Sequence, residues 1–157
     1  SCWTVLADAT NLDQFCQNNT VDEFYLCHTL EHIHTLSYSE FLRNMYRKLK
    51  PGGVVLVVQT DVGKVLEMMS RSELTFRAGR TAIFTPKDRL KKNVYHQHFN
   101  MWSADELVRD FEACGFLATA FDAGSWKYDQ IDELVPEDTI KCHGVRIPNL
   151  GVRAIKK

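Results

Sequence analysis

The sequence predicts an α/β protein built on a mostly parallel sheet with crossover helices. Two observations support this fold class: β-rich runs alternate with amphipathic helical patterns, and glycine or proline stands where one pattern changes into the other. The clearest strand is Val54–Gln59, an uninterrupted run that is typical of a strand buried on both faces of its sheet. At 157 residues, the chain fits one domain with enough core to fold alone.

Two helices are expected between the strands. In SYSEFLRNMYRKLKPGG, Ser37 and Glu40 form a capping-box pattern, and PGG ends the helix. In SADELVRDFEACGF, Ser103 and Glu106 form the same pattern, and Gly115 ends the helix. The apolar face of the first helix contains Phe41, Leu42, Met45, Tyr46 and Leu49. The other expected strands are Trp3–Ala7, Phe24–Cys27, Leu117–Phe121 and Val152–Ile155.

Composition narrows the class of protein. A formal net charge of −1 argues against a general nucleic-acid or membrane-surface binder. The longest uncharged apolar run is far too short to cross a bilayer, and the sequence shows no basic-then-apolar secretory leader. The five cysteines have no CxxC spacing, and their odd number fits no closed disulfide set. We therefore expect reduced thiols in a cytoplasmic protein.

The order of segments "LADAT … VDEFYLCHTLEHI … FLRNMYRKLKPGGVVLVVQTD … HFNMWSADELVRDFEACGF … GVRAIKK" resembles class I S-adenosylmethionine (SAM)-dependent methyltransferases, especially the methyltransferase type 11 group. The likeness runs nearly the length of the chain. It implies a Rossmann-like sheet whose last strand, GVRAIKK, runs antiparallel at one side, and a single methyltransferase-like domain over residues 1–157.

The same resemblance shows what the sequence lacks. The family opens with a glycine-rich GxGxG loop that lets the backbone approach the cofactor, and no GxG occurs in this chain. We therefore expect an N-terminally truncated version of the fold, either a fragment or a degenerate domain. Such a chain would bind SAM weakly or not at all alone. Its open strand edge would be completed by a homodimer partner or by a missing upstream segment.

The resemblance implies four cofactor-binding positions. Asp8 matches the acidic residue that accepts a hydrogen bond from the adenine amino group, and the amide of Ala9 would meet a ring nitrogen. The alternative for Asp8 is a turn residue or helix cap. His28 and Thr29 match the residues whose backbone lies beside the methionine part of SAM.

A histidine cluster in HTLEH permits a metal site as a second interpretation. His28, Glu31 and His32 have i, i+3, i+4 spacing, so they share one side of a helical turn. Some relatives carry ExxEH here and bind a divalent metal, and the imidazole at the first position would shift the preference from magnesium toward zinc, manganese or iron. His96 or His98 would add a ligand. Because LEH occurs in many relatives without a metal, the sequence favours a metal-free cofactor edge, with Glu31 stabilised by a helix N-terminus.

Residues 71–100 are expected to form a lid or substrate loop. The segment 71–95 is rich in Arg and Lys and has little periodicity. The basic stretch 71–92 would recognise an anionic substrate, or would be only a solvated loop. Asp61 would face the same pocket. Trp102 and Trp126 are candidates for its wall, although single aromatic residues more often belong to the core.

Two functions follow from these features. The first is an enzyme, a SAM-dependent methyltransferase that acts on an O, N or C nucleophile of a small or anionic substrate. The donor is already activated, so positioning would supply most of the catalysis. Where the acceptor must lose a proton, His32 and His98 are the predicted catalytic bases, with His28 a further candidate. The second is a non-catalytic methyltransferase-like binding or structural subunit, which the missing glycine loop favours. A dehydrogenase would also need a glycine fingerprint.

Overall fold

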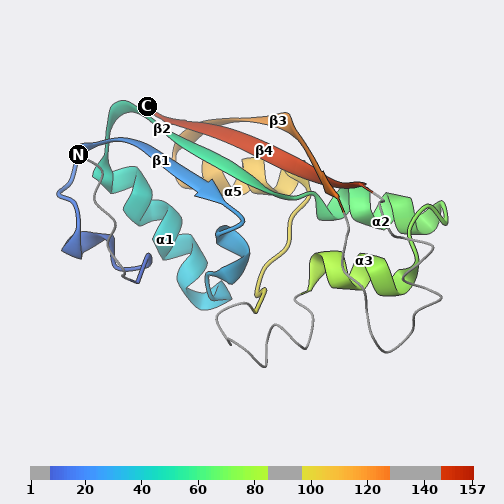
Figure 1. Cartoon of the computed structure of the whole chain (residues 1–157). Helices are drawn as coiled ribbons and strands as arrows, with labels where there is room; N and C mark the ends of the chain where they lie inside the picture. Colours follow the sequence, from blue (N-terminus) through green and yellow to red (C-terminus); the bar gives the residue numbers. More distant parts are fainter. Residues whose placement is uncertain (1–7, 85–96, 128–145) are drawn as a thin grey trace.

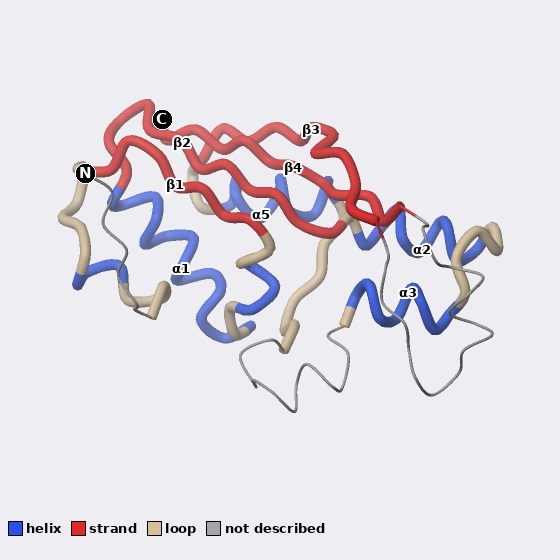
Figure 2. The backbone as a smooth tube through the Cα atoms, viewed as in Figure 1, coloured by secondary structure: helices blue, strands red, loops and turns tan. Residues whose placement is uncertain are grey.

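A sheet and a layer of helices make up the computed structural model, which describes residues 8–84, 97–127 and 146–157. The helices gather on one face of the sheet, as Figure 1 and the backbone tube in Figure 2 both show. The described elements, in chain order, are η1 (Leu12–Gln14), β1 (Val21–Cys27), η2 (Leu30–His32), α1 (Thr35–Lys48), β2 (Leu49–Thr60), α2 (Val62–Ser70), α3 (Phe76–Ile83), α5 (Ala104–Ala113), β3 (Phe116–Lys127) and β4 (Arg146–Lys156).

The strands lie in the order β1-β2-β4-β3. β1 pairs with β2 in parallel, and β4 is antiparallel to both β2 and β3. β1, β2 and β3 therefore run in one direction, and their carboxyl ends reach the same edge of the sheet. The α/β class and the antiparallel last strand are confirmed. However, β4 lies between β2 and β3, not at the side of the sheet.

All four described strands are longer than the sequence predicted, and β2 shows the reason most clearly. It begins at Leu49 and contains the PGG turn, which was expected to precede the strand. Gly52 has a φ of 78°, which bends the chain without the steric cost a side chain would carry. The pairing of Val21 with Leu49 and of Glu23 with Val54 accommodates the extra residues as a bulge. The predicted strand Trp3–Ala7 lies outside the described residues.

The two helix caps turned out differently. The capping box of Ser103 and Glu106 at the start of α5 is confirmed. The box predicted for Ser37 and Glu40 is wrong, because α1 begins at Thr35 and the side chain of His34 caps it by accepting from the Leu36 amide at 3.2 Å. The carboxylate of Glu40 pairs instead with arginines farther along α1.

The core lies between the sheet and the helices α1 and α5. One face of β2 contributes Val55 and Val57, which are at most 1% exposed, against Leu42 and Met45 of α1 and Leu107 of α5. Fully buried aliphatic and aromatic side chains of this kind supply most of the free energy of folding. A second buried cluster joins α2 and α3 to the start of β4.

The opposite face of the sheet is only partly covered in the described residues. On β2, Val54, Leu56 and Val58 are half-buried, so the predicted burial of this strand on both faces is wrong. On the neighbouring strands Tyr25 is 62% and Leu117 is 51% exposed. Within the described parts of the chain, no helix has the length and apolarity needed to cross a membrane.

Candidate functional site

The carboxyl end of β1 carries a compact polar cluster. His28 follows the last residue of the strand, and its amide still bonds the Val58 carbonyl of β2 at 2.8 Å. Its φ of 48° is in the left-handed region, which is uncommon for a residue with a side chain. The chain therefore leaves the sheet abruptly here and enters the short helix η2 at the edge where ligands bind in open α/β sheets.

Glu31 is the buried carboxylate of this cluster, with 7% of the residue exposed. Leu30, which is fully buried, fixes the position of η2. The Nδ1 of His28 donates to Oε1 of Glu31 at 3.2 Å, whereas Oε2 is buried and has no hydrogen-bond partner among the described residues. Burial raises the pKa of Glu31, but the hydrogen bond from His28 and the nearby imidazoles more than offset this effect. The net pKa is below the ordinary value, so the carboxyl group is ionised at neutral pH.

Residues 97–100, here called the return segment, lie against η2. The loop that leads into α5 thus reaches back to the end of β1 and fixes the backbone on both sides of Glu31. Three hydrogen bonds join the two parts: Phe99 N to Glu31 O (2.7 Å), His32 Nδ1 to Gln97 O (3.1 Å) and Asn100 Nδ2 to Ile33 O (2.6 Å).

His98 connects the return segment to α3. Its Nδ1 donates to the carbonyl of Ile83, the last residue of α3, at 2.7 Å. Its ring meets that of His32 edge-on with 4.9 Å between centroids. Burial lowers the pKa of His98, and the bond to Ile83 and the charge of Glu31 only partly oppose this shift. The structure thus brings together His32 and His98, the two predicted catalytic residues.

The groups that could hold a metal differ from those the sequence suggested. Glu31, His32 and His98 each offer a ligand atom, and these atoms lie within 4.8 Å of one another. His28 is not one of these three residues. It supports Glu31 by donating a hydrogen bond to its carboxylate. His96 lies outside the described residues.

The predicted adenine-binding residues form an exposed turn. The amide and hydroxyl of Thr10 donate to Oδ1 of Asp8 at 2.9 and 2.7 Å, and these bonds lower the pKa of Asp8. Within the described chain, Oδ2 of Asp8 makes no hydrogen bond, so it can accept one from an adenine amino group. Ala9 is also exposed. Thr29 is half-buried and donates to the Cys27 carbonyl at 3.1 Å, which braces the end of β1.

Two of the proposed pocket-wall residues have structural roles. Asp61 is buried and caps α2 by accepting from the Lys64 amide at 3.1 Å. Trp102 is 6% exposed, and its indole donates to Oδ2 of Asp110 at 2.8 Å. Of the two alternatives for Trp102, the core position is therefore confirmed and the pocket wall is wrong, since Trp102 lies in the core beneath α5. The side chain of Trp126 lies outside the described residues.

Part of the expected lid is a regular helix. The sequence showed little periodicity over residues 71–95, yet α3 occupies Phe76–Ile83 and buries Ala78 and Ala82 against α2. Thr75 caps the helix by accepting from the Ala78 amide at 3.2 Å. The short apolar face made of small residues hid this helix in the sequence. Residues 85–96 are outside the described range, and the lid function stays a prediction.

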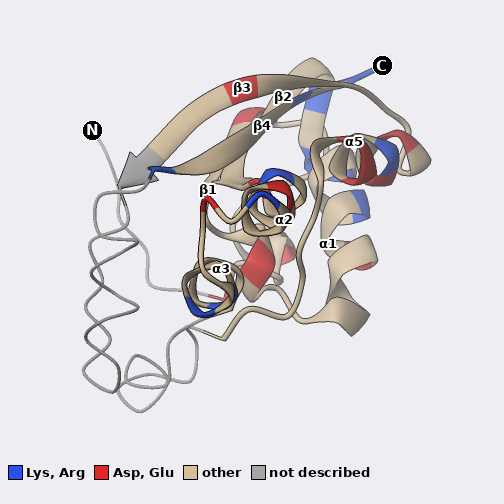
Figure 3. Cartoon of the chain, turned by 90° about the vertical axis from the view of Figure 1, so that its right-hand side faces the viewer, with Lys and Arg blue, Asp and Glu red and all other residues tan. Residues whose placement is uncertain are grey.

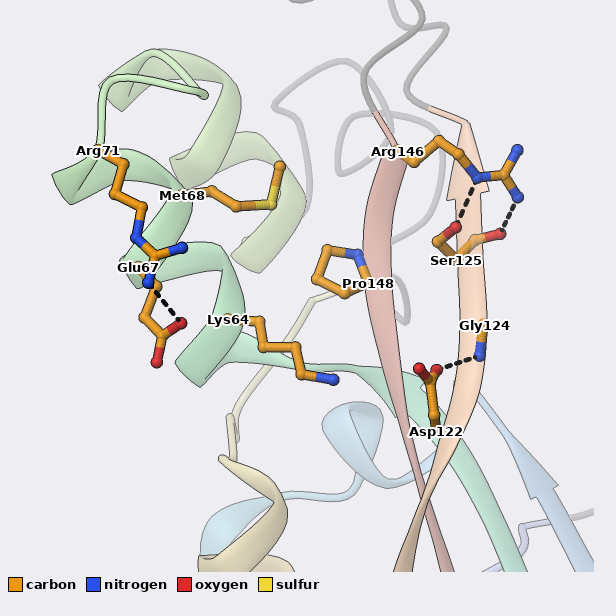
Figure 4. Close-up of a pocket in the computed structure, with 9 residues that line it drawn as sticks. All are labelled: Lys64, Glu67, Met68, Arg71, Asp122, Gly124, Ser125, Arg146 and Pro148. Atoms are coloured by element: carbon orange, nitrogen blue, oxygen red, sulfur yellow. Dashed lines mark hydrogen bonds and ion pairs between the residues drawn. The ribbon is translucent and has the colours of Figure 1, made fainter.

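A cavity of about 420 Å³ lies farther along the same edge of the sheet, between α2, the carboxyl end of β3 and the amino end of β4. Figure 4 shows Lys64 extending from α2 toward the two strands, with Arg146 on the far wall bonded to Ser125. Figure 3 marks the positions of Lys and Arg in blue on the ribbons of α2 and α3. No local sequence pattern pointed to this cavity, because its walls come from segments that are distant in the sequence. The lining residues are Lys64, Glu67, Met68, Arg71, Asp122, Gly124, Ser125, Arg146 and Pro148.

Two buried amides were also missed. Gln59 at the end of β2 and Asn149 on β4 are at most 8% exposed, and each has a side-chain oxygen without a hydrogen-bond partner in the described structure. Buried polar atoms are normally paired, so each of these oxygens marks a position where an ordered water or a ligand would supply the missing hydrogen bond. A glutamine that closes the apolar run VVLVVQ was the available signal.

Comparison with known proteins gives one family and many structural relatives. A family model described as "Methyltransferase domain" matches residues 7–120. No curated protein sequence matches significantly. A SAM-dependent methyltransferase from Archaeoglobus fulgidus is 15% identical with a TM-score of 0.57, covering 97% of this chain and 66% of its own.

Two further solved structures are similar to the chain. A SAM-dependent methyltransferase from Methanosarcina mazei is 14% identical with a TM-score of 0.57, covering 96% of this chain and 65% of its own. The phosphoethanolamine N-methyltransferase 2 of Haemonchus contortus, in complex with SAM, is 15% identical with a TM-score of 0.53. The match covers 95% of this chain and 36% of the nematode protein. The chain thus spans about two thirds of the archaeal proteins and about a third of the nematode protein.

Proposed function

This chain belongs to the methyltransferase domain family, and on that premise we propose that the protein transfers a methyl group from SAM to an O, N or C nucleophile of a small or anionic substrate. The observation that carries the proposal is the cluster of Glu31, His32 and His98 at the carboxyl end of β1. This is the edge of an open α/β sheet where ligands bind. The proposal includes a cytoplasmic location, which the odd number of cysteines favours.

Four residues would hold the cofactor, which supplies a methyl group already activated on a sulfonium. Asp8 would accept a hydrogen bond from the adenine amino group through its unbonded Oδ2, and the exposed Ala9 would present its amide to a ring nitrogen. The backbone of His28 and Thr29 would lie along the methionine part. The left-handed conformation of His28 supports this role, because it turns the chain away from the sheet and leaves room at the strand end.

His32 and His98 are the proposed catalytic residues. Because each Nδ1 donates to a backbone carbonyl, each ring is held in one orientation and one tautomer. A neutral imidazole in that state carries its lone pair on Nε2. The two rings would orient the acceptor for in-line attack and, for a hydroxyl or amine acceptor, accept its proton.

An anionic substrate would find cationic groups beside this site. Lys64, Arg71 and Arg146 contribute to the walls of the cavity between α2, β3 and β4, where Glu67 and Asp122 offset part of their charge. We propose that this cavity, together with the basic segment 71–92, receives the charged part of the substrate. Guanidinium groups suit phosphate and carboxylate because they donate two parallel hydrogen bonds.

Ligand-observed NMR tests the cofactor part of the proposal. We expect saturation transfer from the chain to S-adenosylhomocysteine at millimolar ligand, with weak affinity, and clearly less transfer with Asp8→Ala. Asp22→Ala is the matched control, since this exposed carboxylate pairs with Lys50 on β2. Absence of transfer with the unmodified chain, or equal transfer with Asp8→Ala, would contradict the assignment.

A non-catalytic methyltransferase-like subunit is the second candidate, and the absence of any GxG in the sequence favours it. The two functions differ in product formation, because an enzyme would methylate an acceptor repeatedly and a non-catalytic subunit would not. Incubation with radiolabelled SAM and a panel of phosphorylated and carboxylated amines and alcohols should give labelled product for the enzyme. Cofactor binding without product from any acceptor would favour the subunit.

A further inference from the structure

The geometry points to a binding site for a divalent transition-metal ion, held by the Glu31 carboxylate and the imidazoles of His32 and His98. These residues lie on η2 and on the return segment, and their ligand atoms are within 4.8 Å of one another. The sequence favoured a metal-free strand end because LEH occurs in many relatives without a metal, and its spacing offered His28 as a ligand beside Glu31 and His32. Metal binding goes beyond the proposed methyl transfer, since it can be measured without cofactor or acceptor.

The carboxylate is the first argument. Glu31 is 93% removed from solvent, since 7% of the residue is exposed. Only Oε1 has a partner, and Oε2 is a buried carboxyl oxygen without a hydrogen bond among the described residues. Leaving such an oxygen unpaired is costly, and a cation is the group that compensates it best.

The imidazoles are the second argument. The Nδ1 of His32 bonds the Gln97 carbonyl, and the Nδ1 of His98 bonds the Ile83 carbonyl. A carbonyl only accepts, so each Nδ1 carries a hydrogen, and in the neutral ring Nε2 is the nitrogen that offers a lone pair to a metal. Metal-binding histidines are characteristically held in this way, with one nitrogen donating to a backbone carbonyl and the other on the metal.

The support around Glu31 is the third argument. His28 donates to Oε1 and thereby orients the carboxylate with Oε2 as its remaining acceptor. The hydrogen bond from Phe99 N to Glu31 O, at 2.7 Å, ties the segment that bears His98 to η2. Two parts of the chain that are distant in sequence, η2 and the return segment, are therefore fixed relative to one another at this cluster.

The ligand set selects the class of metal. Two imidazoles and one carboxylate suit Zn²⁺, Mn²⁺ or Fe²⁺, whereas Mg²⁺ and Ca²⁺ prefer oxygen ligands. Bonds of about 2.1 Å in a tetrahedral site bring ligand atoms to about 3.4 Å from one another. Small side-chain rotations would close the present spacing of up to 4.8 Å to that value. Three protein ligands leave a position open.

The open position gives the ion a function that rests on the proposed methyl transfer. An anionic or hydroxyl oxygen of the acceptor would bind there, beside the cofactor edge. His32 and His98 would then act on the acceptor through the ion that they hold. Loss of the ion and loss of methyl transfer remain distinguishable, because the first is a binding measurement on the chain alone.

Metal content after dialysis tests the site. The full 157-residue chain is stripped with chelator and then dialysed separately against Zn²⁺, Mn²⁺ and, without oxygen, Fe²⁺. Elemental analysis should give about one equivalent of at least one metal. Glu31→Gln and His98→Ala should each weaken binding by at least about tenfold, a change of about 1.4 kcal/mol in binding free energy.

His34→Asn is the matched control. It removes an imidazole two positions after His32 but keeps a good helix N-cap at the start of α1. This variant should bind metal as the unmodified chain does. Bound Co²⁺ should also show visible absorption bands that His98→Ala loses while its far-UV circular dichroism is unchanged. Less than about a tenth of an equivalent in the unmodified chain, or equal binding by His98→Ala, would overturn the inference.

Discussion

Individual side chains near the site are held by distant partners. Oδ2 of Asp110, on α5, accepts from the Tyr38 hydroxyl of α1 at 3.0 Å and from the Trp102 indole at 2.8 Å. The rings of Tyr38 and Trp102 are in contact, with 5.0 Å between centroids. Burial, reinforced by the charge and hydrogen bond of Asp110, raises the pKa of Tyr38, so the phenol stays protonated and donates. One carboxylate thus joins α1, α5 and Trp102, which follows the return segment.

Asp110→Ala should therefore be strongly destabilising. Two donors would lose their acceptor inside the core, at a cost of about 2–4 kcal/mol in the free energy of unfolding. Tyr38→Phe, which removes one donor and leaves the acceptor, should cost only about 1 kcal/mol. Denaturant unfolding of both variants and of the double variant gives the coupling between the two residues. A decrease of less than about 0.5 kcal/mol in the free energy of unfolding of Asp110→Ala would show that the two hydrogen bonds to Asp110 contribute little to stability.

At the scale of elements, the helix starts decide how the loops enter the site. The N-terminus of α5 follows directly after the return segment and Trp102. Its capping box uses Oε2 of Glu106, which accepts from the amide of Ser103 at 3.1 Å and from its hydroxyl at 2.9 Å. These two bonds lower the pKa of Glu106. The cap thus sets where the loop ends and the helix begins.

Ser103→Ala should lower the free energy of unfolding by about 1 kcal/mol at pH 7. The folded state binds the Glu106 proton less tightly than the unfolded chain. The contribution of the ionised Glu106 carboxylate to the free energy of unfolding is complete above the unfolded pKa of about 4.3. It is lost as the pH falls through the lower pKa of the folded state. The difference between the variant and the unmodified chain should therefore shrink between pH 5 and about pH 3. A constant difference across this range would contradict the role of Glu106.

The return segment gives a second prediction about elements. Asn100 donates to the Ile33 carbonyl and accepts from the Thr35 hydroxyl at 3.0 Å, so it fastens the segment to the start of α1. In Asn100→Ala, the Phe99 amide, which bonds Glu31, should exchange with solvent at least about tenfold faster. Hydrogen-exchange mass spectrometry or NMR measures this rate. Amides in β2 should be unaffected and serve as the internal control.

At the scale of the whole molecule, the sheet has one well-packed and one partly open face. The helices cover the first face, as Figure 1 shows. On the other face, Tyr25 of β1 and Leu117 of β3 are more than half exposed in the described structure. β1 also lies at the end of the strand order. Exposed apolar patches and unpaired strand edges both favour association with another chain.

We therefore expect the 157-residue chain to self-associate. Multi-angle light scattering between about 10 and 200 µM should show an average mass that rises with concentration. Tyr25→Lys together with Leu117→Lys should reduce this rise, while the melting temperature changes little because both side chains face solvent. A constant monomer mass, with fast exchange of the Phe24–Cys27 amides, would contradict this prediction.

The sequence by itself determined the order of the four described strands and of helices α1 and α5, and the position of the polar cluster, whereas it did not predict α2 or α3. β-branched runs, amphipathic stripes and PGG or Gly115 punctuation are local signals, and they identified β1, β2, α1, α5, β3 and β4 correctly. The family's segments then placed His28 and His32 at a strand end. Local patterns could not show where β4 inserts, since an antiparallel strand reads the same at an edge or inside a sheet.

Only the tertiary structure decided which residues meet at that strand end. His98 joins Glu31 and His32 because the Phe99 amide bonds the Glu31 carbonyl across more than sixty residues of chain, and the Ile83 carbonyl of α3 accepts from His98. The same folding withdrew Trp102 into the core, where Asp110 satisfies its indole, and released His34 to cap α1. Residue types and spacing nominate groups for a site, but burial and hydrogen-bond partners are properties of the packed chain and select among them.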